Sequence, residues 1–333
     1  MTNCGSDRGM RPSEFELIER LFAPLATAPG AFGLNDDVAT LAPRMGHDLV
    51  LKVDAIVEGV HFLATDPADS VAKKALRVNL SDLAAKGATP LGYLLSLSMP
   101  DSTGMRWLES FANGLAEDQQ TFGISLLGGD TTATPGPLSL AVTAIGEVAS
   151  ETMTRRQGAR TGDSVFVSGS IGDAGGGLAI SRGGGGPLSK EEREYLIARY
   201  RLPSPRLSLG CALRGLATSA LDVSDGLIAD LGHIADVSKV RILVEAERIP
   251  RSPALRALWG DDLPAIVRAA TAGDDYEIAF TAPAGAEPAV LEVARRTATP
   301  VTRIGRVEGD TGVGLLDANG RDIPVARGGF THF

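Results

Sequence analysis

The segment Ile124-Ser125-Leu126-Leu127-Gly128-Gly129-Asp130 joins a short apolar run to two glycines and an aspartate. The apolar run is typical of a buried strand. Glycine has no Cβ, so the backbone after the run can approach a ligand closely, and a carboxylate oxygen is a preferred ligand of hard cations such as Mg²⁺. The segment therefore predicts a strand that leads into a metal or polyphosphate site.

Further aspartates in similar settings occur along the chain, at Asp37, Asp54, Asp82, Asp222 with Asp225, and Asp274. Each one alone could be a turn or a helix cap, because aspartate and glycine are common in both. Four of the six motifs, however, follow strand-like runs, and α/β proteins build their sites at strand ends. Two carboxylates about 4 Å apart repel by roughly 4 kcal/mol at an effective dielectric of ~20, so a shared cleft would need cations.

Composition limits the class of protein. A chain of 333 residues exceeds the usual size of one core, which predicts two domains. The 41 acidic and 32 basic residues give a net charge of -9, which argues against a nucleic-acid or anionic-membrane partner. The two cysteines fit neither a disulfide framework nor a zinc site. With no signal-peptide core and no long apolar span, we expect a cytoplasmic protein.

Strand-like and helix-like patterns alternate, so the predicted fold class is α/β (α+β). The predicted strands cover 49–57, 91–99, 124–127, 137–148, 164–168, 220–221, 241–245 and 276–281. The predicted helices cover 69–87, 105–122, 190–199, 206–218 and 226–237, with further helices starting at 13 and 178. The alternation of strand-like and helix-like segments begins again after about residue 150. This repetition predicts two domains, 1–149 and 150–333.

Two helices carry specific signals. Ser13 and Glu16 form a capping box pattern, followed by apolar residues expected on one face, Phe15, Ile18, Leu21 and Phe22. In the helix 69–87, Asn79, Asp82 and Lys86 share one face. That polar stripe is either a solvated face or part of a site, and its motif favours the site.

Two glycine-rich stretches remain. Gly169, Gly172 and Gly175 do not have the spacing of a dinucleotide fingerprint, so residues 169–177 predict a tight turn between strand and helix. The run Gly183 to Gly186 predicts a mobile loop, whose role the sequence leaves open.

Five ordered motifs together resemble the thiamine-monophosphate kinase family, within the aminoimidazole ribonucleotide synthetase superfamily. They begin at Asp54, Val78, Gly128, Asp222 and Gly273, and read Asp-Ala-Ile-Val-Glu-Gly-Val-His-Phe, Val-Asn-Leu-Ser-Asp-Leu-Ala-Ala-Lys-Gly-Ala, Gly-Gly-Asp-Thr-Thr, Asp-Val-Ser-Asp-Gly-Leu-Ile-Ala-Asp-Leu and Gly-Asp-Asp-Tyr-Glu. The final Gly-Phe-Thr-His-Phe also looks like the end of that family's sequences.

The resemblance implies a two-domain fold. Its N-terminal α/β domain would hold metal and ATP and form the sheet interface of a homodimer, and its C-terminal α/β domain would complete the substrate site. It also implies direct in-line transfer of the γ-phosphoryl of ATP to thiamine monophosphate, giving thiamine diphosphate, with several Mg²⁺ ions.

Residue roles follow from the same resemblance, motif by motif. The implied metal ligands are Asp37, Val53, Asp54, Asp82, Asp130, Asp222 and Asp225. The implied ATP contacts are Gly129, Asp130, Arg156 and Ser224, of which Asp130 and Arg156 would be catalytic. The acceptor substrate would contact His61, Asp274, Arg327 and Phe330.

The chain also departs from the family pattern. Lys52-Val53 replaces a frequent Ser/Thr pair; Val53 can offer only its carbonyl, and Lys52 brings a cation of its own, so the number of metal ions stays open. Arg327 stands where an aromatic residue is common in the family. How the protein binds the thiamine ring therefore stays open.

The alternatives are another enzyme of the superfamily, such as selenophosphate synthetase, the hydrogenase maturation enzyme or aminoimidazole ribonucleotide synthetase itself, and a non-catalytic homologue. Selenophosphate synthetase needs a reactive cysteine in a glycine-rich loop, whereas Cys4 lies in a polar leader. The hydrogenase maturation enzyme needs a C-terminal cysteine, whereas this sequence ends in His332-Phe333. A non-catalytic nucleotide-binding homologue is disfavoured because all six candidate carboxylates are present.

Overall fold

The computed structural model describes residues 13–326 and 328–330. Within this part the chain forms two compact units. The first unit contains the chain up to Ala42, Val53–Ala75 and Gly92–Thr143, and the second contains Pro43–Lys52, Leu76–Leu91 and the chain from Ala144 onward. The division into domains 1–149 and 150–333 stays a prediction.

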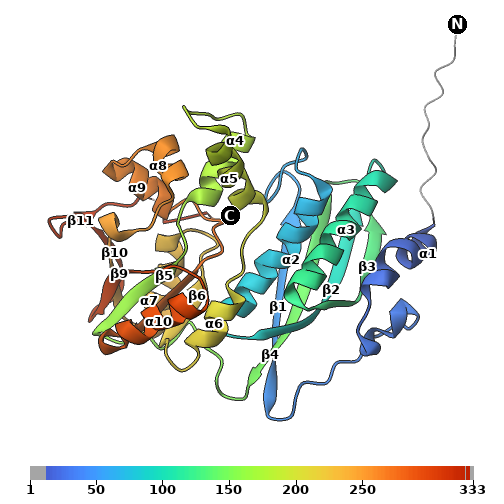
Figure 1. The fold of residues 1–333 in the computed structure, drawn as a ribbon, viewed down its shortest axis with the longest axis horizontal. Coiled ribbons are helices and arrows are strands. Elements are labelled where there is room, and N and C mark those ends of the chain that lie inside the picture. Colours follow the sequence, from blue (N-terminus) through green and yellow to red (C-terminus); the bar gives the residue numbers. More distant parts are fainter. Residues whose placement is uncertain (1–12, 327, 331–333) are drawn as a thin grey trace, which may run out of the picture. The chain divides into compact units, whose positions relative to one another are not determined.

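The N-terminal half contains a four-stranded sheet. Its strands lie in the order β1-β4-β2-β3, with bounds β1 (His47–Val57), β2 (Thr89–Met99), β3 (Ser125–Ala133) and β4 (Ser139–Ala149). Figure 1 shows the helices α2 (Ala68–Ala85) and α3 (Met105–Phe122) side by side against this sheet. They approach closely because Gly114 has no side chain: a Cβ there would lie 2.4 Å from the carbonyl oxygen of Asp69.

Helix α3 follows directly from its sequence. Leu108, Phe111 and Leu115 recur at helical spacing and are all buried. Gly123 ends the helix in the left-handed conformation, with φ 66°. Both ends of α3 match the prediction.

The second unit contains a seven-stranded mixed sheet in the order β11-β10-β7-β9-β5-β8-β6. The bounds are β5 (Asp163–Ser168), β6 (Ser219–Asp222), β7 (Arg241–Glu245), β8 (Ile278–Pro283), β9 (Val301–Glu308), β10 (Gly312–Leu316) and β11 (Asp322–Ile323). β10 and β7 are parallel, and the other neighbouring pairs are antiparallel.

Side chains alternate between the two faces of this sheet, so β5 contributes to two cores. Val165 and Val167 pack in one core with α7 (Leu227–Ser238). Phe166 stacks on Phe280 in the other core, which α6 (Leu207–Leu213) and α10 (Glu287–Arg296) cover. A mixed α/β architecture is therefore confirmed.

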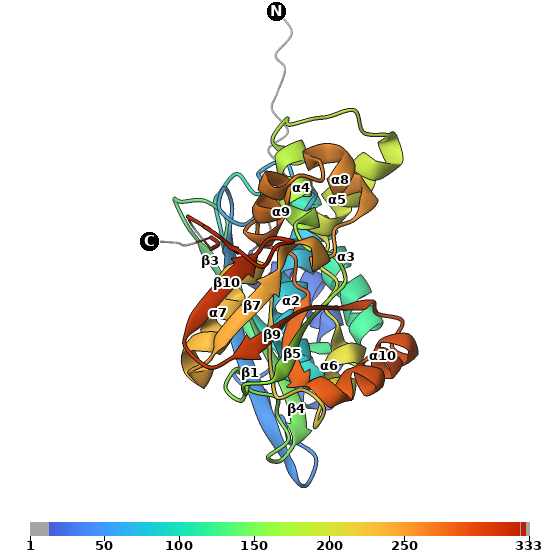
Figure 2. The same ribbon diagram turned by 90° about the vertical axis from the view of Figure 1, so that its left-hand side faces the viewer.

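A third apolar cluster lies among the helices α4, α5, α8 and α9, which gather together in Figures 1 and 2. Their bounds are α4 (Asp173–Ser181), α5 (Lys190–Arg201), α8 (Pro253–Trp259) and α9 (Leu263–Ala270). The sequence predicted α4 only from residue 178 because its glycines indicated a turn. That boundary is wrong: a Cβ at Gly177 would lie 2.0 Å from the Leu196 carbonyl oxygen, so glycine lets α5 pack against α4.

Other predicted boundaries also need correction. The capping box of Ser13 and Glu16 is present, but α1 (Glu14–Leu17) is short and gives way to π- and 3₁₀-helical turns. Phe15 is exposed instead of lying on the buried face. Helix α6 ends at Leu213, five residues before its predicted end, and Gly215 follows with φ 75°. In the part of the chain that the structure describes, no helix has the length and apolar character needed to cross a membrane.

Candidate functional site

The site residues of the first unit lie on strands and exposed turns. Asp130 lies within β3, opposite Ser96 of β2, and is exposed. Asp54 lies within β1, so neither carboxylate follows a strand end as predicted. β1 and β3 are the two edge strands of their sheet, which places Asp54 and Asp130 at opposite edges. Asp37 lies in an exposed irregular segment.

Gly129 is required by packing within the sheet. A Cβ at this position would lie 1.9 Å from the carbonyl oxygen of Leu95 on β2. Val53 lies on β1, at the opposite edge of the sheet, and has 58% of its surface exposed. It is the one predicted metal ligand that is not an aspartate. Neither residue contributes a polar side chain, so each could contact a ligand only through its backbone.

His61 is oriented by its neighbours in the first unit. Its Nδ1 accepts a hydrogen bond of 3.0 Å from the Val57 N–H, and its carbonyl oxygen accepts one of 3.0 Å from Lys74 Nζ. Because Nδ1 is the acceptor, the proton of the neutral ring is on Nε2. His61 can therefore present an N–H donor to an anionic ligand.

In the second unit, the polar stripe of α2 is a buried feature. Asn79 is fully buried, so the interpretation as a solvated face is wrong. Lys52 Nζ lies 2.8 Å from Asp82 Oδ2, with side chains that are 30% and 16% exposed. Lys86 Nζ donates to the Ala220 carbonyl oxygen at 2.8 Å. Burial, followed by repulsion from Arg156, lowers the pKa of Lys86 to about 8.

Asp222 lies at the end of β6 and is buried. Burial raises the pKa of its carboxyl well above the ordinary value, and the charge of Asp82 raises it further. A hydrogen bond from Ser81 and the charge of Lys52 oppose this shift. The structure therefore brings the predicted metal ligands Asp82 and Asp222 together, as two repelling carboxylates near Lys52 and Lys86.

The loop after β6 is shaped by Asp230 on α7. Its Oδ2 accepts hydrogen bonds from the N–H groups of Ser224, Asp225 and Gly226 at 3.0, 3.0 and 3.1 Å. Burial and the charge of Asp225 raise the pKa of Asp230 to about 7. Ligand atoms of Asp225, Asp230 and His233 lie within 4.8 Å of one another, so this group could hold a cation. The sequence missed Asp230 and His233 as candidates.

Backbone hydrogen bonds join this loop to two other segments of the second unit. Asp274 N donates to Ser224 O at 2.7 Å, and Phe330 N donates to Asp225 O at 2.8 Å. Asp274 has a φ of 65°, an uncommon left-handed conformation. Predicted ATP, metal and acceptor residues thus lie together here. Arg327 lies outside the described residues.

Arg156 belongs to the same unit. Its side chain is exposed, and its charge depresses the pKa of Lys86. Its carbonyl oxygen accepts a hydrogen bond of 3.5 Å from Ser238 Oγ on α7. The guanidinium therefore lies near Lys86, where a phosphate would reduce the repulsion between the two cations.

The sequence also missed a buried network at the end of the Gly273 to Glu277 motif. Glu277 is fully buried; Arg206 binds its two carboxylate oxygens at 2.7 and 2.5 Å, and Arg199 binds it at 2.9 Å. Ser168 Oγ adds a hydrogen bond of 2.6 Å. Glu277 is thus fully compensated, and the network fixes one end of the Asp274 turn. The motif named Glu277, but no local pattern identified its arginine partners.

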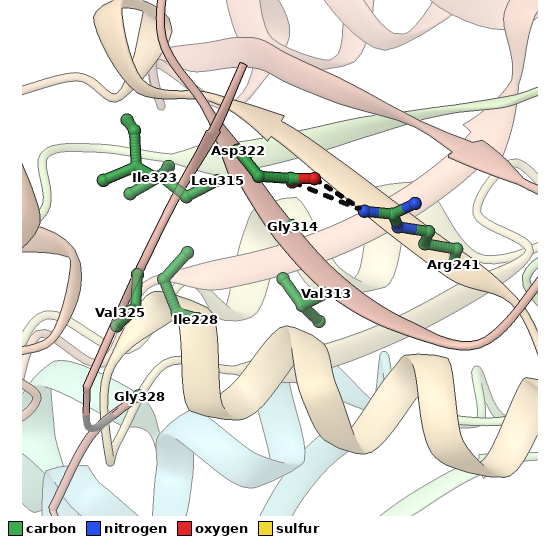
Figure 3. Close-up of a pocket in the computed structure, with 9 residues that line it drawn as sticks. All are labelled: Ile228, Arg241, Val313, Gly314, Leu315, Asp322, Ile323, Val325 and Gly328. Carbon is green, nitrogen blue, oxygen red and sulfur yellow. Dashed lines mark hydrogen bonds and ion pairs between the residues drawn. The ribbon is translucent and has the colours of Figure 1, made fainter. Parts of the chain in front are cut away.

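A separate pocket of about 320 Å³ lies beside α7 and the C-terminal segment (Figure 3). Its lining combines aliphatic side chains with one charged pair, Arg241 and Asp322, matched at 3.2 Å. The lining residues are Ile228, Arg241, Val313, Gly314, Leu315, Asp322, Ile323, Val325 and Gly328. None of the predicted site residues is among them.

Comparison with known proteins covers nearly the whole chain. The family described as AIR synthase related protein matches with its N-terminal domain at residues 35–148 and its C-terminal domain at residues 160–317. A thiamine-monophosphate kinase of Caulobacter vibrioides is 44% identical, over 96% of this chain and 91% of that protein.

Two solved structures are also similar. The thiamine-monophosphate kinase from Stenotrophomonas maltophilia K279a has a TM-score of 0.83 at 42% identity, covering 94% of this chain and 99% of that one. AaThiL, solved as a complex with AMPPCP and TMP, has a TM-score of 0.76 at 29% identity, covering 97% and 99%. The chain therefore belongs to the thiamine-monophosphate kinase family, among the AIR synthase related proteins.

Proposed function

We propose that this protein transfers the γ-phosphoryl group of ATP to thiamine monophosphate and so forms thiamine diphosphate. The observation that carries the proposal is the 2.7 Å hydrogen bond between Asp274 and Ser224, which joins a predicted acceptor contact to a predicted ATP contact. Phosphoryl transfer needs its two anionic substrates held side by side in a fixed orientation. The complex of AaThiL with AMPPCP, an ATP analogue, and TMP supports the same pair of ligands.

The carboxylates fit Mg²⁺ ions. Asp82 and Asp222 repel each other in a partly buried place, and Asp225 has further ligand atoms close by. Oxygen ligands of this kind are the ones that Mg²⁺ takes. We propose that Asp37, Asp54, Asp82, Asp130, Asp222, Asp225 and the Val53 carbonyl group hold the ions. Bound Mg²⁺ would supply positive charge against the phosphate oxygens.

The chain's own residues would then position and neutralise the phosphates. Arg156 would lie against the ATP phosphates as the catalytic cation, with the Gly129 and Ser224 groups as further contacts. The His61 Nε2–H would donate to the acceptor phosphate, and Asp274 and Phe330 would contact the acceptor. A phosphate monoester is already largely ionised at neutral pH, so in-line transfer would need no protein base.

The proposal is tested by incubating the protein with ATP, Mg²⁺ and thiamine monophosphate and measuring thiamine diphosphate. We expect turnover in the wild type. Asp130→Asn should reduce kcat by about 10²-fold or more, because it removes one charge-stabilising group while keeping the shape of the side chain. Absence of product from folded wild-type protein would refute the proposed activity. Near wild-type turnover of Asp130→Asn would refute only the assignment of Asp130.

We also propose a homodimer. Leu49, Leu51 and Val53 are 40%, 66% and 58% exposed on β1, an edge strand. A row of exposed apolar side chains on an edge strand favours cover by a second copy. Light scattering at micromolar concentration should give about twice the chain mass, and a mass near 34.6 kDa would contradict the dimer. The cytoplasmic location stays a prediction.

A further inference from the structure

We propose that the Lys52 ammonium group is a built-in cation at Asp82 and takes the place of one Mg²⁺ ion there. Lys52 lies on β1 and Asp82 on α2, and Lys52 Nζ is 2.8 Å from Asp82 Oδ2. This inference rests on the proposed Mg²⁺-dependent function. It concerns the question that the Lys52-Val53 pair left open, namely how many ions the site takes.

The Asp82 group needs a cation even before a ligand arrives. The Asp82 side chain is only 16% exposed, and it lies close enough to the buried Asp222 for its charge to raise the pKa of Asp222. Lys52 acts on both carboxylates, because its charge also lowers the pKa of Asp222. An ion pair that is mostly shielded from water is stronger than one on the surface.

Lys86 is less suited to this role. Its Nζ donates to the Ala220 carbonyl oxygen at 2.8 Å, so the ammonium group is held at β6 instead of at the Asp82 carboxylate. Lys52 and Arg156 both contribute to lowering the pKa of Lys86. Of these three cations, Lys52 is the one that forms an ion pair with Asp82.

The ion pair has a direct consequence for metal binding. Asp82 Oδ2 already accepts from an ammonium group, so a Mg²⁺ ion could use that oxygen only by displacing Lys52. Displacement would cost the ion pair and would leave two cations in the same small region. The chain should therefore bind one Mg²⁺ ion fewer per protomer than a variant without the lysine charge.

The experiment compares full-length wild type, Lys52→Met, Lys52→Ser and Lys52→Arg. Mn²⁺ binding is counted by electron paramagnetic resonance, and Mg²⁺ affinity is measured from the rise of the melting temperature, both without nucleotide. We expect Lys52→Met and Lys52→Ser to bind one more Mn²⁺ per chain and to bind Mg²⁺ about tenfold or more tightly. Lys52→Arg keeps the charge and should match the wild type.

Lys73→Met provides the matched control. Lys73 also forms an ion pair with a carboxylate, 2.6 Å from Glu117, and its side chain is 13% exposed, but neither residue belongs to the proposed metal ligands. Its Mg²⁺ affinity and Mn²⁺ count should equal those of the wild type. Unchanged stoichiometry and affinity in both neutral Lys52 variants would overturn the inference. Because neither readout needs turnover, failure of the kinase assay would overturn the proposed function separately.

Discussion

Two groups of buried carboxylates in the second unit differ in how their charge is balanced. Glu277 is matched by two arginines and a serine hydroxyl, all at hydrogen-bond distance. Asp82 forms an ion pair with Lys52, and Lys86 interacts with both Asp82 and Asp222, yet the pKa of Asp222 stays raised. The negative charge of Glu277 is therefore balanced by side chains of this chain, whereas the negative charge of Asp82 and Asp222 is balanced only in part.

The difference separates structural from functional carboxylates. A buried charge that is fully paired holds the fold in one arrangement, because removing either partner leaves the other uncompensated. A buried charge that lacks full compensation stores unfavourable energy that a bound cation can release. By this criterion Glu277 is a structural carboxylate that fixes the Asp274 turn. Asp82 and Asp222 are functional carboxylates that would be stabilised by a bound cation.

The largest expected effect is the loss of stability on Glu277→Gln. Neutralising Glu277 leaves Arg199 and Arg206 buried without their anion, which should cost about 3–5 kcal/mol of unfolding free energy. Urea denaturation monitored by circular dichroism measures it. Arg295→Ala breaks a pair in which both side chains are exposed, Arg295 with Glu292, and serves as a comparison. A loss below about 1 kcal/mol for Glu277→Gln would contradict the structural role assigned to this network.

Asp222→Asn should have the opposite pattern. The amide removes a charge that burial and Asp82 both disfavour, so stability without Mg²⁺ should be equal to or above that of the wild type. Activity should fall by about 10²-fold, because a group proposed to hold cations at the phosphates is lost. Melting curves in EDTA and the kinase assay measure the two effects. If Asp222→Asn destabilised the protein as much as Glu277→Gln, the two groups would not differ as proposed.

Binding of Mg²⁺ and ATP at Asp82 and Asp222 should stabilise the folded wild-type protein. Mg²⁺ with ATP at 100 times the dissociation constant should add about 2.7 kcal/mol to the unfolding free energy, and EDTA should reverse the gain. The gain should be much smaller in Asp222→Asn and unchanged in an exposed variant such as Asp101→Asn. An unaltered melting curve of the wild type at millimolar Mg²⁺ and ATP would count against the whole cation site.

The last effect, the smallest when it is measured over one pH unit, concerns Asp275, beside the Glu277 network. Burial raises its pKa to about 8, whereas the hydrogen bonds from Gly172 N and Ala174 N and the charge of Arg199 oppose the shift. The folded state therefore holds the proton more tightly than the unfolded chain, whose pKa is near 3.8. Stability should be greatest at low pH and decline as pH rises toward about 8, by up to about 1.4 kcal/mol per pH unit.

Denaturant unfolding between pH 5 and 8 measures this slope. Asp275→Asn cannot ionise at this position, so its slope should be shallower by the same amount, whereas Asp101→Asn should keep the wild-type slope. Equal slopes in Asp275→Asn and wild type would show that Asp275 stays ionised throughout this range.

Periodic segments were predicted well from the sequence. α3 has the predicted ends because its apolar spacing is regular and Gly123 stops it. The start of α4 was predicted wrongly because glycine has a low local preference for a helix. In the structure Gly177 is required by the close approach of Leu196 on α5, and Gly175 by contact with Ala272. The elements α8, α9, α10 and β9 to β11 were not predicted, although they complete the second sheet and its helical cover.

The candidate site shows the same division. The motifs identified Asp82, Asp222, Ser224, Asp225 and Asp274, and the structure brings these residues into two neighbourhoods of one unit. The motifs could not identify Arg199 and Arg206 as partners of Glu277, because those residues are about 70 positions away in the chain. The sequence also treated Lys52 as a departure from a pattern, and its contact with Asp82 became visible only in three dimensions.

Gly129 has a practical consequence for the interpretation of related sequences. The glycine is required because the carbonyl oxygen of Leu95 leaves no room for a side chain, and this requirement persists whether or not the protein still catalyses a reaction. Asp130 is exposed beside it and has no such packing role. In a relative that has lost catalysis, the glycine should therefore remain while the aspartate is free to drift. Loss of the aspartate, but not persistence of the glycine, would therefore indicate that a relative no longer catalyses the reaction. A search for inactive relatives should evaluate positions 129 and 130 separately.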